Sequence, residues 1–444
     1  MKQLNSANLT SQFFRYTFLN ILSMLGLSFY ILADTIIIAS AAGNDGLTAL
    51  NLALPAFSLM SALGQMVAMG ASALFSAYKG NNDGLSANRI FTVGIYISAV
   101  ISLIVFICGL FFSAPICTLL GADESMLSLT DGYLKILLLF GPAFVFNNLF
   151  TYFVRNDSNP KLAMCAMLAS SISNVFLDML FVFVFKMGIQ GAAIATGISP
   201  ILSLIILSLH FITKRNTVKL AFHIPAPERI FRVITIGSPV FVTECAFGVV
   251  MLAINYTVLG LTGNVGVAAY SIISNVALVA KSFFSGIAQG VQPLVSFSCG
   301  RNDGASIRKL CIMAVIMSAV TGVVLYLLCV IFKTPLIDIF NTDRDPEMAR
   351  IAAEGVPMYF PAFIIMGINM FAEVFFSSVQ KPARSFIISV LRGLVIVLIM
   401  IAVLPPVMGM TGVWIAVPLT EIIVCAFALP SMLVWTSRNK QLKS

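Results

Sequence analysis

Apolar residues recur along this chain in long runs that short polar connections separate. A run of about 20 apolar residues is long enough for one helix to cross the hydrocarbon core of a bilayer. Twelve such runs lie near residues 12–39, 47–78, 90–113, 131–153, 161–185, 190–212, 230–258, 266–298, 310–332, 349–376, 385–404 and 410–436. The pattern predicts an all-α membrane protein with twelve transmembrane helices.

Composition supports this fold class. Hydrophobic residues make up 59% of the 444 residues and charged residues only 10%, whereas soluble domains carry about 25% charged residues. A water-soluble fold would leave too much apolar surface uncovered, so the lipid bilayer is the expected surrounding. The eight cysteines include no C-x-x-C pair and are expected to be small apolar filler.

The net charge of +8 is distributed over the connections between the runs. Lys and Arg gather at every second connection, and the connections between these are poor in basic residues or acidic, as at Asp123–Glu124. The basic positions include Lys79, Arg89, Arg155, Lys161, Lys214, Arg215, Lys219, Arg229, Arg232, Arg301, Arg308, Lys309, Lys381, Arg384, Arg438, Lys440 and Lys443. By the positive-inside rule, this alternation predicts cytoplasmic N- and C-termini and an even number of spans. The positive balance is thus a topology signal, and no nucleic-acid partner is expected.

The sequence also repeats itself. Gly80-Asn81-Asn82-Asp83-Gly84 aligns with Gly300-Arg301-Asn302-Asp303-Gly304 at an offset of 220 residues, and Gly43 falls on Gly263 in the same register. Near the end of each half, Met187–Gly191 matches Met408–Gly412 at an offset of 221. Six spans per copy is an even number, so both copies enter the membrane in the same direction, as in transporters built from parallel repeats. We predict two pseudosymmetric six-helix lobes, at 1–213 and 230–444, joined by a cytoplasmic linker at 214–229.

Four polar residues of the first copy lie within apolar runs and break the repeat: Asp34, Asn174, Asp178 and Thr196. Their repeat partners are the apolar residues Ile254, Val395 or Ile396, Ile399 or Met400, and Val417. A charged side chain at mid-bilayer costs about 2.5–3.5 kcal/mol on insertion scales, so one that is retained there is a functional-site hypothesis. Two such acids in one copy of a repeat indicate ion-coupled transport.

The two acids are expected to lie at similar depth in the extracellular half of the first lobe, because their spans both run outward. Two nearby carboxylates in a low dielectric titrate as a coupled pair, which suits a proton carrier. The same oxygens, with Asn174, Thr196 and backbone carbonyls, would instead suit Na⁺. A hydrogen-bonded structural pair is the remaining alternative.

The second copy carries a different polar set. Glu244 and Lys281 lie in the seventh and eighth spans, where they form either a self-neutralising structural pair or a substrate or secondary ion site. Tyr30 and Gln289 are further candidates for that role. Glu373 and Arg392 are expected nearer the cytoplasmic face, paired or snorkelling.

Other chemistry finds little support. No G-x-x-x-x-G-K-[ST] phosphate loop is present, and neither His210 nor His223 has a partner at metal or triad spacing, so both are expected to be solvated or interfacial. No nucleophile–base set or metal set is found. We therefore expect no enzyme activity, no cofactor, and no metal beyond Na⁺ at the ion-coupling residues.

Several motifs together resemble the multidrug and toxic compound extrusion (MATE) family, bacterial cation–drug antiporter branch. They are Ala33-Asp34-Thr35, Arg155–Pro160, Ser173-Asn174 through Leu177-Asp178, Gly191–Thr196, and Ala288-Gln289-Gly290 through Gln292-Pro293. The resemblance implies two six-helix lobes forming a V that opens alternately to either face, and exchange of H⁺ or Na⁺ for organic cations. It also implies that Asp34, Asn174, Asp178 and Thr196 bind the ion, and it assigns Glu244 to the acid of the seventh span.

The chain departs from that family's pattern at two places. No proline lies in the first span, where some members bend, and Gly367 stands near the position where some members carry an acid in the tenth span.

The sequence thus predicts a secondary antiporter of the bacterial plasma membrane that exports lipophilic, often cationic, small organic compounds, with no obligate protein partner. A dedicated metabolite exporter and a lipid-linked precursor flippase of a related fold are the alternatives.

Overall fold

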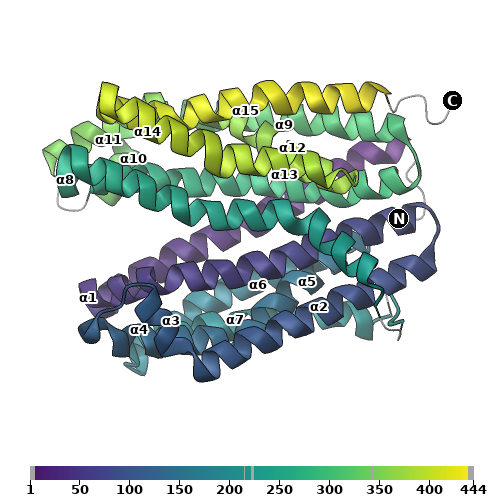
Figure 1. The fold of residues 1–444 in the computed structure, drawn as a ribbon, viewed down its shortest axis with the longest axis horizontal. Coiled ribbons are helices and arrows are strands. Elements are labelled where there is room, and N and C mark those ends of the chain that lie inside the picture. Colours follow the sequence, from purple (N-terminus) through teal and green to yellow (C-terminus); the bar gives the residue numbers. More distant parts are fainter. Residues whose placement is uncertain (1–5, 215, 222–224, 342–344, 439–444) are drawn as a thin grey trace. The chain divides into compact units, whose positions relative to one another are not determined.

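The computed structural model describes residues 6–214, 216–221, 225–341 and 345–438, and within these ranges it contains helices and no strand. The predicted all-α class is confirmed. Figure 1 shows the helices in chain order. The first half contains α1 (Ser6–Gly80), α2 (Gly84–Phe111), α3 (Ser113–Leu119), α4 (Glu124–Leu139), α5 (Gly141–Asn156), α6 (Pro160–Asp178), the π-helix η1 (Met179–Val184) and α7 (Gly188–Ile212). The second contains α8 (Pro227–Gly300), α9 (Gly304–Ile331), α10 (Lys333–Phe340), α11 (Pro346–Tyr359), α12 (Ala362–Ser378), α13 (Pro382–Val390), η2 (Leu391–Val395), α14 (Ile396–Met408) and α15 (Met410–Arg438).

The helices α1 and α8 are each two membrane spans joined at a glycine. They contain 75 and 74 residues, which is about 110 Å at 1.5 Å per residue and far more than the roughly 30 Å of a hydrocarbon core. Non-helical backbone interrupts them at Gly43 (φ 58°, ψ −148°) and Gly263 (φ 64°, ψ −158°). Glycine adopts this left-handed φ without steric cost, so both breaks fall where the sequence permits them.

The number of spans agrees with the prediction. In the described part of the chain, nine helices are long and apolar enough to cross a membrane, or eleven if each bent pair is one span. The bent pairs are α4 with α5, at 44°, and α11 with α12, at 55°. That number counts α8 once, although Gly263 divides it into two segments of crossing length. Dividing α8 gives twelve spans.

The repeat is visible in the backbone. Gly43 and Gly263, the two break points, are repeat partners. Asp83 and Asp303 occupy equivalent N-cap positions of α2 and α9, and each accepts a hydrogen bond at 3.0 Å from the backbone N–H three residues on. A side chain that caps the first turn fixes the start of a helix. The same local rules therefore begin equivalent helices in both copies.

The chain divides into two compact units with two interchanged segments. Leu22–Cys245 belong to the first unit, whereas Ser6–Ile21 and Ala246–Ser444 belong to the second. The start of α1 thus packs within the second unit, and the start of α8 within the first. The predicted lobes at 1–213 and 230–444 take no account of this interchange, and their boundaries stay a prediction.

Glycines allow the interchanged segments to pack closely. In the first unit, a Cβ added at Gly70 would lie 2.0 Å from the Val233 carbonyl oxygen of α8. In the second unit, a Cβ added at Gly290 would lie 2.7 Å from Thr17 Cα of α1, and one at Gly286 would lie 2.5 Å from Ile21 Cα. Small residues let membrane helices approach backbone to backbone. Gly70 and Gly290 are repeat partners, so each unit uses the same device.

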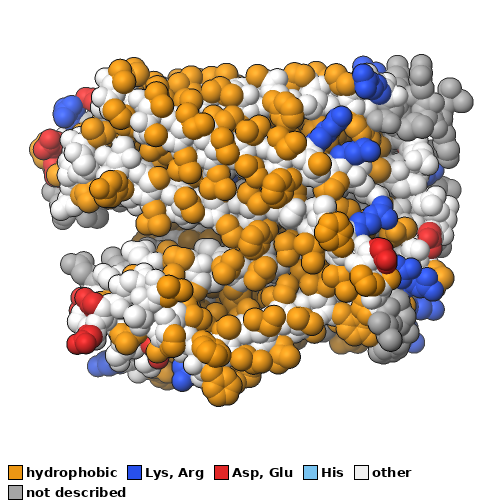
Figure 2. All heavy atoms as spheres, viewed as in Figure 1, with side chains coloured by type: hydrophobic (Ala, Val, Ile, Leu, Met, Phe, Trp, Pro, Cys, Tyr) orange, Lys and Arg blue, Asp and Glu red, His pale blue; other side chains and the backbone are white. Residues whose placement is uncertain are grey.

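The sides of the helices carry the large apolar side chains, and charged side chains gather mostly near the helix ends (Figure 2). Ile316 on α9 and Ile205 on α7, for example, are 57% and 58% exposed. Exposed apolar faces of this extent are typical of a protein surrounded by lipid. The chain is a multi-pass membrane protein.

Candidate functional site

The predicted ion-coupling residues gather in the first unit, on α1, α6 and α7. An added Cβ at Gly26 would lie 2.6 Å from Leu168 Cδ2 and 3.7 Å from Ser171 Oγ, so α1 lies directly against α6 at this level. Two helical turns further on, Asp34 of α1 and Asp178 of α6 are in direct electrostatic contact. The structure therefore brings together the two acids that the sequence singled out.

The oxygens of this pair lack donors. Asp178 has no exposed area, and neither of its carboxylate oxygens has a hydrogen-bond partner; Asp34 Oδ1 and Asn174 Oδ1 are likewise buried without one. Ionised carboxylates only accept hydrogen bonds, so two that face each other cannot satisfy each other unless a proton or a cation lies between them. A proton or a cation between the two carboxylates would relieve this arrangement.

Asn174 and Thr196 extend the same polar group. Asn174 Nδ2 donates to Thr196 Oγ1 at 3.3 Å, which joins α6 to α7. Asn174 lies one helical turn before Asp178, on the same face of α6. The side chains of Asn174 and Thr196 are buried, with exposures of 1% and 7%. The hydrogen bond to Thr196 fixes the orientation of the Asn174 amide group, and with it the position of the amide oxygen.

Two tyrosines complete the surroundings of the acids. Tyr30 of α1 and Tyr133 of α4 are both in electrostatic contact with Asp34 and Asp178. The sequence analysis included Tyr30 as a substrate or secondary ion candidate, and it missed Tyr133, which is 2% exposed. Nothing in the sequence marks Tyr133, because a tyrosine in an apolar span is ordinary. Only the packing of α4 against α7 reveals it.

The helix geometry changes at the site. Directly after Asp178, α6 continues as the π-helix η1. A π-helical turn widens the helix and leaves its hydrogen bonds less regular, and such turns are frequent at functional sites. The break in regular geometry therefore coincides with the buried acid.

The remaining candidates do not join this group. Glu244 lies in the first unit on α8, whereas Lys281 and Gln289 lie in the second unit. Lys281 Nζ lies 4.8 Å from the ring centroid of Phe247, in a cation–π contact between the two halves of α8. The pairing of Glu244 with Lys281 stays a prediction.

The second unit contains a buried ion pair instead. Arg392 Nη2 lies 2.9 Å from Glu421 Oε1, and Arg392 Nε donates to both oxygens of Glu421 at 2.9 and 3.1 Å. Asn369 Nδ2 donates to Glu421 Oε2 at 2.6 Å. Glu373 is 5% exposed and in electrostatic contact with Arg392. Arg392 is thus paired, as one of the two predicted alternatives held, but its partner is Glu421, an acid of the last span that the same search for intramembrane charges should have found.

His210 is buried, so the solvated alternative predicted for it is wrong. His210 is 1% exposed, and its Nε2 lies 2.9 Å from Asp157 Oδ2. Thr217 binds the same carboxylate through its backbone N–H at 2.7 Å and through its hydroxyl. This cluster fastens the connection after α7 to the end of α5. His223 lies outside the described residues.

In the described part of the chain, no group of three or more His, Cys, Asp or Glu side chains is placed so that it could hold a metal ion. The fold and the site together define a class: a helical membrane protein built from two parallel copies, with one copy holding a buried carboxylate pair, as in secondary transporters.

A family model described as MatE matches residues 20–180 and 239–404. The chain therefore belongs to the multidrug and toxic compound extrusion (MATE) family of membrane transporters. The chain is also 27% identical over 400 residues to the multidrug export protein MepA of Staphylococcus saprophyticus, covering 89% of this chain and 86% of MepA. MepA of Staphylococcus aureus matches with the same identity and coverage.

Solved structures show the same fold. An outward-facing multidrug resistance MATE family transporter of the MOP superfamily matches with a TM-score of 0.92 and 20% identity, covering 97% of this chain and 96% of that protein. A MOP superfamily transporter from Pyrococcus furiosus matches with a TM-score of 0.91 and 19% identity, covering 98% of this chain and 97% of that protein. The predicted fold class is confirmed.

Proposed function

We propose that this protein is an ion-coupled antiporter that exports lipophilic, often cationic, organic compounds in exchange for H⁺ or Na⁺. The observation that carries the proposal is the Asp34–Asp178 pair, whose buried oxygens lack hydrogen-bond donors. Binding of a cation stabilises such a site strongly, because an unpaired buried charge carries a large free-energy penalty. The MepA relatives, which are named multidrug export proteins, support the substrate class.

In the proposed cycle, the ion and the substrate favour opposite states of the transporter. Binding of H⁺ or Na⁺ at Asp34 and Asp178, with Asn174 and Thr196 beside them, favours substrate release outside. A membrane potential near 100 mV supplies about 2.3 kcal/mol per charge. This energy shifts a two-state equilibrium by about fiftyfold, since about 1.4 kcal/mol is a factor of ten.

We further propose that the protein lies in a bacterial plasma membrane with both termini in the cytoplasm. The alternation of basic connections supports this orientation. Membership of the MATE family supports a transporter that is not an enzyme, and we propose that it needs no cofactor.

Efflux of a fluorescent lipophilic cation tests the function. Cells that lack their own pumps would express wild type, Asp34→Asn or Asp178→Asn, and efflux would be followed under an imposed pH gradient and then an imposed Na⁺ gradient. Asp45→Asn is the matched control, because Asp45 is an exposed acid on the same helix.

We expect one gradient to drive efflux in wild type and in Asp45→Asn, and neither gradient to drive it in the two site variants. Wild type that moves no dye under either gradient would contradict the drug-export proposal. A dedicated metabolite exporter or a lipid-linked precursor flippase would then be the better description.

A further inference from the structure

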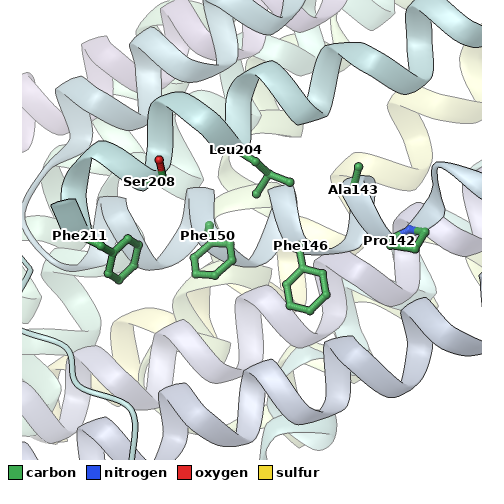
Figure 3. Close-up of a pocket in the computed structure, with 7 residues that line it drawn as sticks. All are labelled: Pro142, Ala143, Phe146, Phe150, Leu204, Ser208 and Phe211. Carbon is green, nitrogen blue, oxygen red and sulfur yellow. The ribbon is translucent and has the colours of Figure 1, made fainter.

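A pocket of about 500 Å³ lies between α5 and α7, within the first unit, and none of the four ion-coupling residues lines it. Figure 3 shows its lining, which consists of Pro142, Ala143, Phe146, Phe150, Leu204, Ser208 and Phe211. The single polar side chain of this lining is that of Ser208, whose hydroxyl donates to the Ile205 carbonyl oxygen at 2.6 Å. The occupant of such a pocket must therefore be apolar over the length that it inserts.

Two phenylalanine rings of the lining, Phe150 and Phe211, pack against each other and against Phe91 of α2. The ring centroids of Phe150 and Phe211 lie 5.7 Å apart, and Phe91 of α2 stacks on Phe211 at 6.2 Å. These rings pack in edge-to-face and stacked arrangements that hold aromatic side chains in place. The pocket is consequently a fixed hollow between helices and is suited to a slender, flexible hydrocarbon chain.

The pocket adjoins the lipid-facing surface. Ile205 and Leu209, which alternate with Leu204 and Ser208 along α7, are 58% and 45% exposed. Residues this apolar and exposed on a membrane span contact the bilayer. The lining residues Leu204 and Ser208 thus lie next to a lipid-facing side of α7.

Two lysines have their backbones close to the Phe211 end of the pocket. Lys214 follows one turn later, and its backbone N–H donates to the Phe211 carbonyl oxygen at 3.1 Å. The backbone N–H of Lys219 donates to Asn88 Oδ1 at 2.9 Å, one turn before Phe91 on α2. Both lysines are exposed. The nearby acid Asp157 faces inward, because Thr217 and His210 bind its carboxylate.

We propose that this pocket binds one acyl chain of an anionic phospholipid, whose headgroup is held by Lys214 and Lys219. The apolar lining matches the chain, and the lysines match the negative charge. Basic pockets at the cytoplasmic side of membrane helices bind anionic headgroups in this way, and the positive-inside orientation proposed above places these lysines at that side. A zwitterionic phospholipid offers the same chains without the net charge.

Native mass spectrometry of the purified full-length protein tests the site. The probes are dioleoyl-phosphatidylglycerol and dioleoyl-phosphatidylcholine, which differ in the headgroup alone. We expect wild type to retain one more molecule of phosphatidylglycerol than of phosphatidylcholine. Each of Lys214→Gln and Lys219→Gln should weaken that binding about fivefold, the effect of about 1 kcal/mol per basic residue near the surface.

Filling the pocket tests the acyl chain. Ser208→Phe should remove the one tightly bound phosphatidylglycerol, whereas Ile316→Phe, the same enlargement of an exposed apolar face on α9, should not. Lys333→Gln, an exposed lysine at the start of α10, is the control for charge. The lysine variants alter exposed side chains alone, so they remain informative if Ser208→Phe fails to fold.

Equal retention of the two lipids by wild type would overturn the proposal, and so would Lys214→Gln and Lys219→Gln proteins that bind phosphatidylglycerol as wild type does. Displacement of the retained lipid by the fluorescent cation used in the efflux assay would also overturn it, because the pocket would then be a substrate site. These outcomes are separate from efflux itself, so the proposed antiport and this lipid site fail independently.

Discussion

Asp178 and Glu421 are both buried carboxylic acids in membrane spans, with exposures of 0% and 3%, yet their surroundings are opposite. Glu421 accepts hydrogen bonds from Arg392 and Asn369. Asp178 faces a second carboxylate and has no donor. Removing one partner of a buried ion pair is destabilising, whereas removing one of two facing acids relieves repulsion between them. The two acids should therefore respond differently to substitution.

Neutralising these two acids should affect stability in opposite directions. Glu421→Gln removes the hydrogen-bonded counter-charge of Arg392 and leaves Glu373 as the acid in electrostatic contact with it. This change should destabilise the protein by about 1–3 kcal/mol. Asp178→Asn removes one of two facing acids and should leave the apparent Tm equal to or above that of wild type. Thermal unfolding of the purified proteins in detergent measures both, with Asp45→Asn as the exposed control. An Asp178→Asn protein as unstable as Glu421→Gln would show that the carboxylate pair is structural.

The long helices α1 and α8 depend on glycine in two different ways. Gly43 and Gly263 provide left-handed backbone at the breaks, and Gly70, Gly237, Gly286 and Gly290 provide the absence of a side chain where helices touch. In the second role the glycines leave room for the neighbouring helix. Replacing such a glycine by alanine, which adds a single methyl group, tests this role.

Gly290→Ala should destabilise the second unit, because the new Cβ would lie 2.7 Å from Thr17 Cα and the helices must move apart. Overpacking of this kind costs about 1–3 kcal/mol. Gly248→Ala in the same helix is the matched control, since no atom lies within 4 Å of an added Cβ there. The apparent Tm in detergent should fall for Gly290→Ala alone. Equal Tm values for the two variants would mean that close helix packing is not needed.

The start of α2 offers a test of an N-cap. The hydroxyl and backbone N–H of Ser86 donate to Asp83 and lower the pKa of this carboxyl group. A lowered pKa in the folded state means that the ionised cap contributes stability above the unfolded value of about 3.9, and that this contribution is lost as the pH falls through the folded value.

Asp83→Ala should therefore cost about 1 kcal/mol at pH 7, and the difference from wild type should shrink towards pH 3. Asp83→Asn keeps a capping oxygen that cannot ionise, so its stability should change less between these pH values than that of wild type. Parallel pH dependence of wild type and Asp83→Asn, measured by thermal unfolding, would contradict this assignment of the cap.

Much of the whole molecule follows from the sequence, for a physical reason. Spans are set by the length of apolar runs, and the repeat by glycines and caps such as Gly43 and Asp83, all of which are local signals. The polar set of the first copy was also visible, because Asp34 and Asp178 stand out against apolar neighbours.

What the sequence does not reveal are contacts between distant residues. His210 and Asp157 are separated by 53 positions, and nothing local marks either as the partner of the other. Tyr133 joins the acids through the packing of α4, and the interchange of Ser6–Ile21 depends on how α1 meets α8. Glu421 is different, because its charge within an apolar span is a local signal in the sequence.

The two copies thus share a backbone plan but differ in charge. The first holds a carboxylate pair that lacks donors, and the second holds the Arg392–Glu421 ion pair. This asymmetry is the reason for placing the coupling ion in the first unit, and it leads to a claim about linkage. An ion and a substrate that favour opposite states must weaken each other's binding.

Binding of the fluorescent cation to the purified protein, measured across a series of pH values and Na⁺ concentrations, tests that claim most directly. The account predicts that the affinity of wild type falls as the coupling ion is added, whether the ion is H⁺ or Na⁺. In Asp34→Asn and Asp178→Asn the affinity should be independent of both ions, whereas Asp45→Asn should behave as wild type. An Asp178→Asn protein whose affinity still follows the ion as wild type does would contradict the account, because the coupling ion would then bind elsewhere.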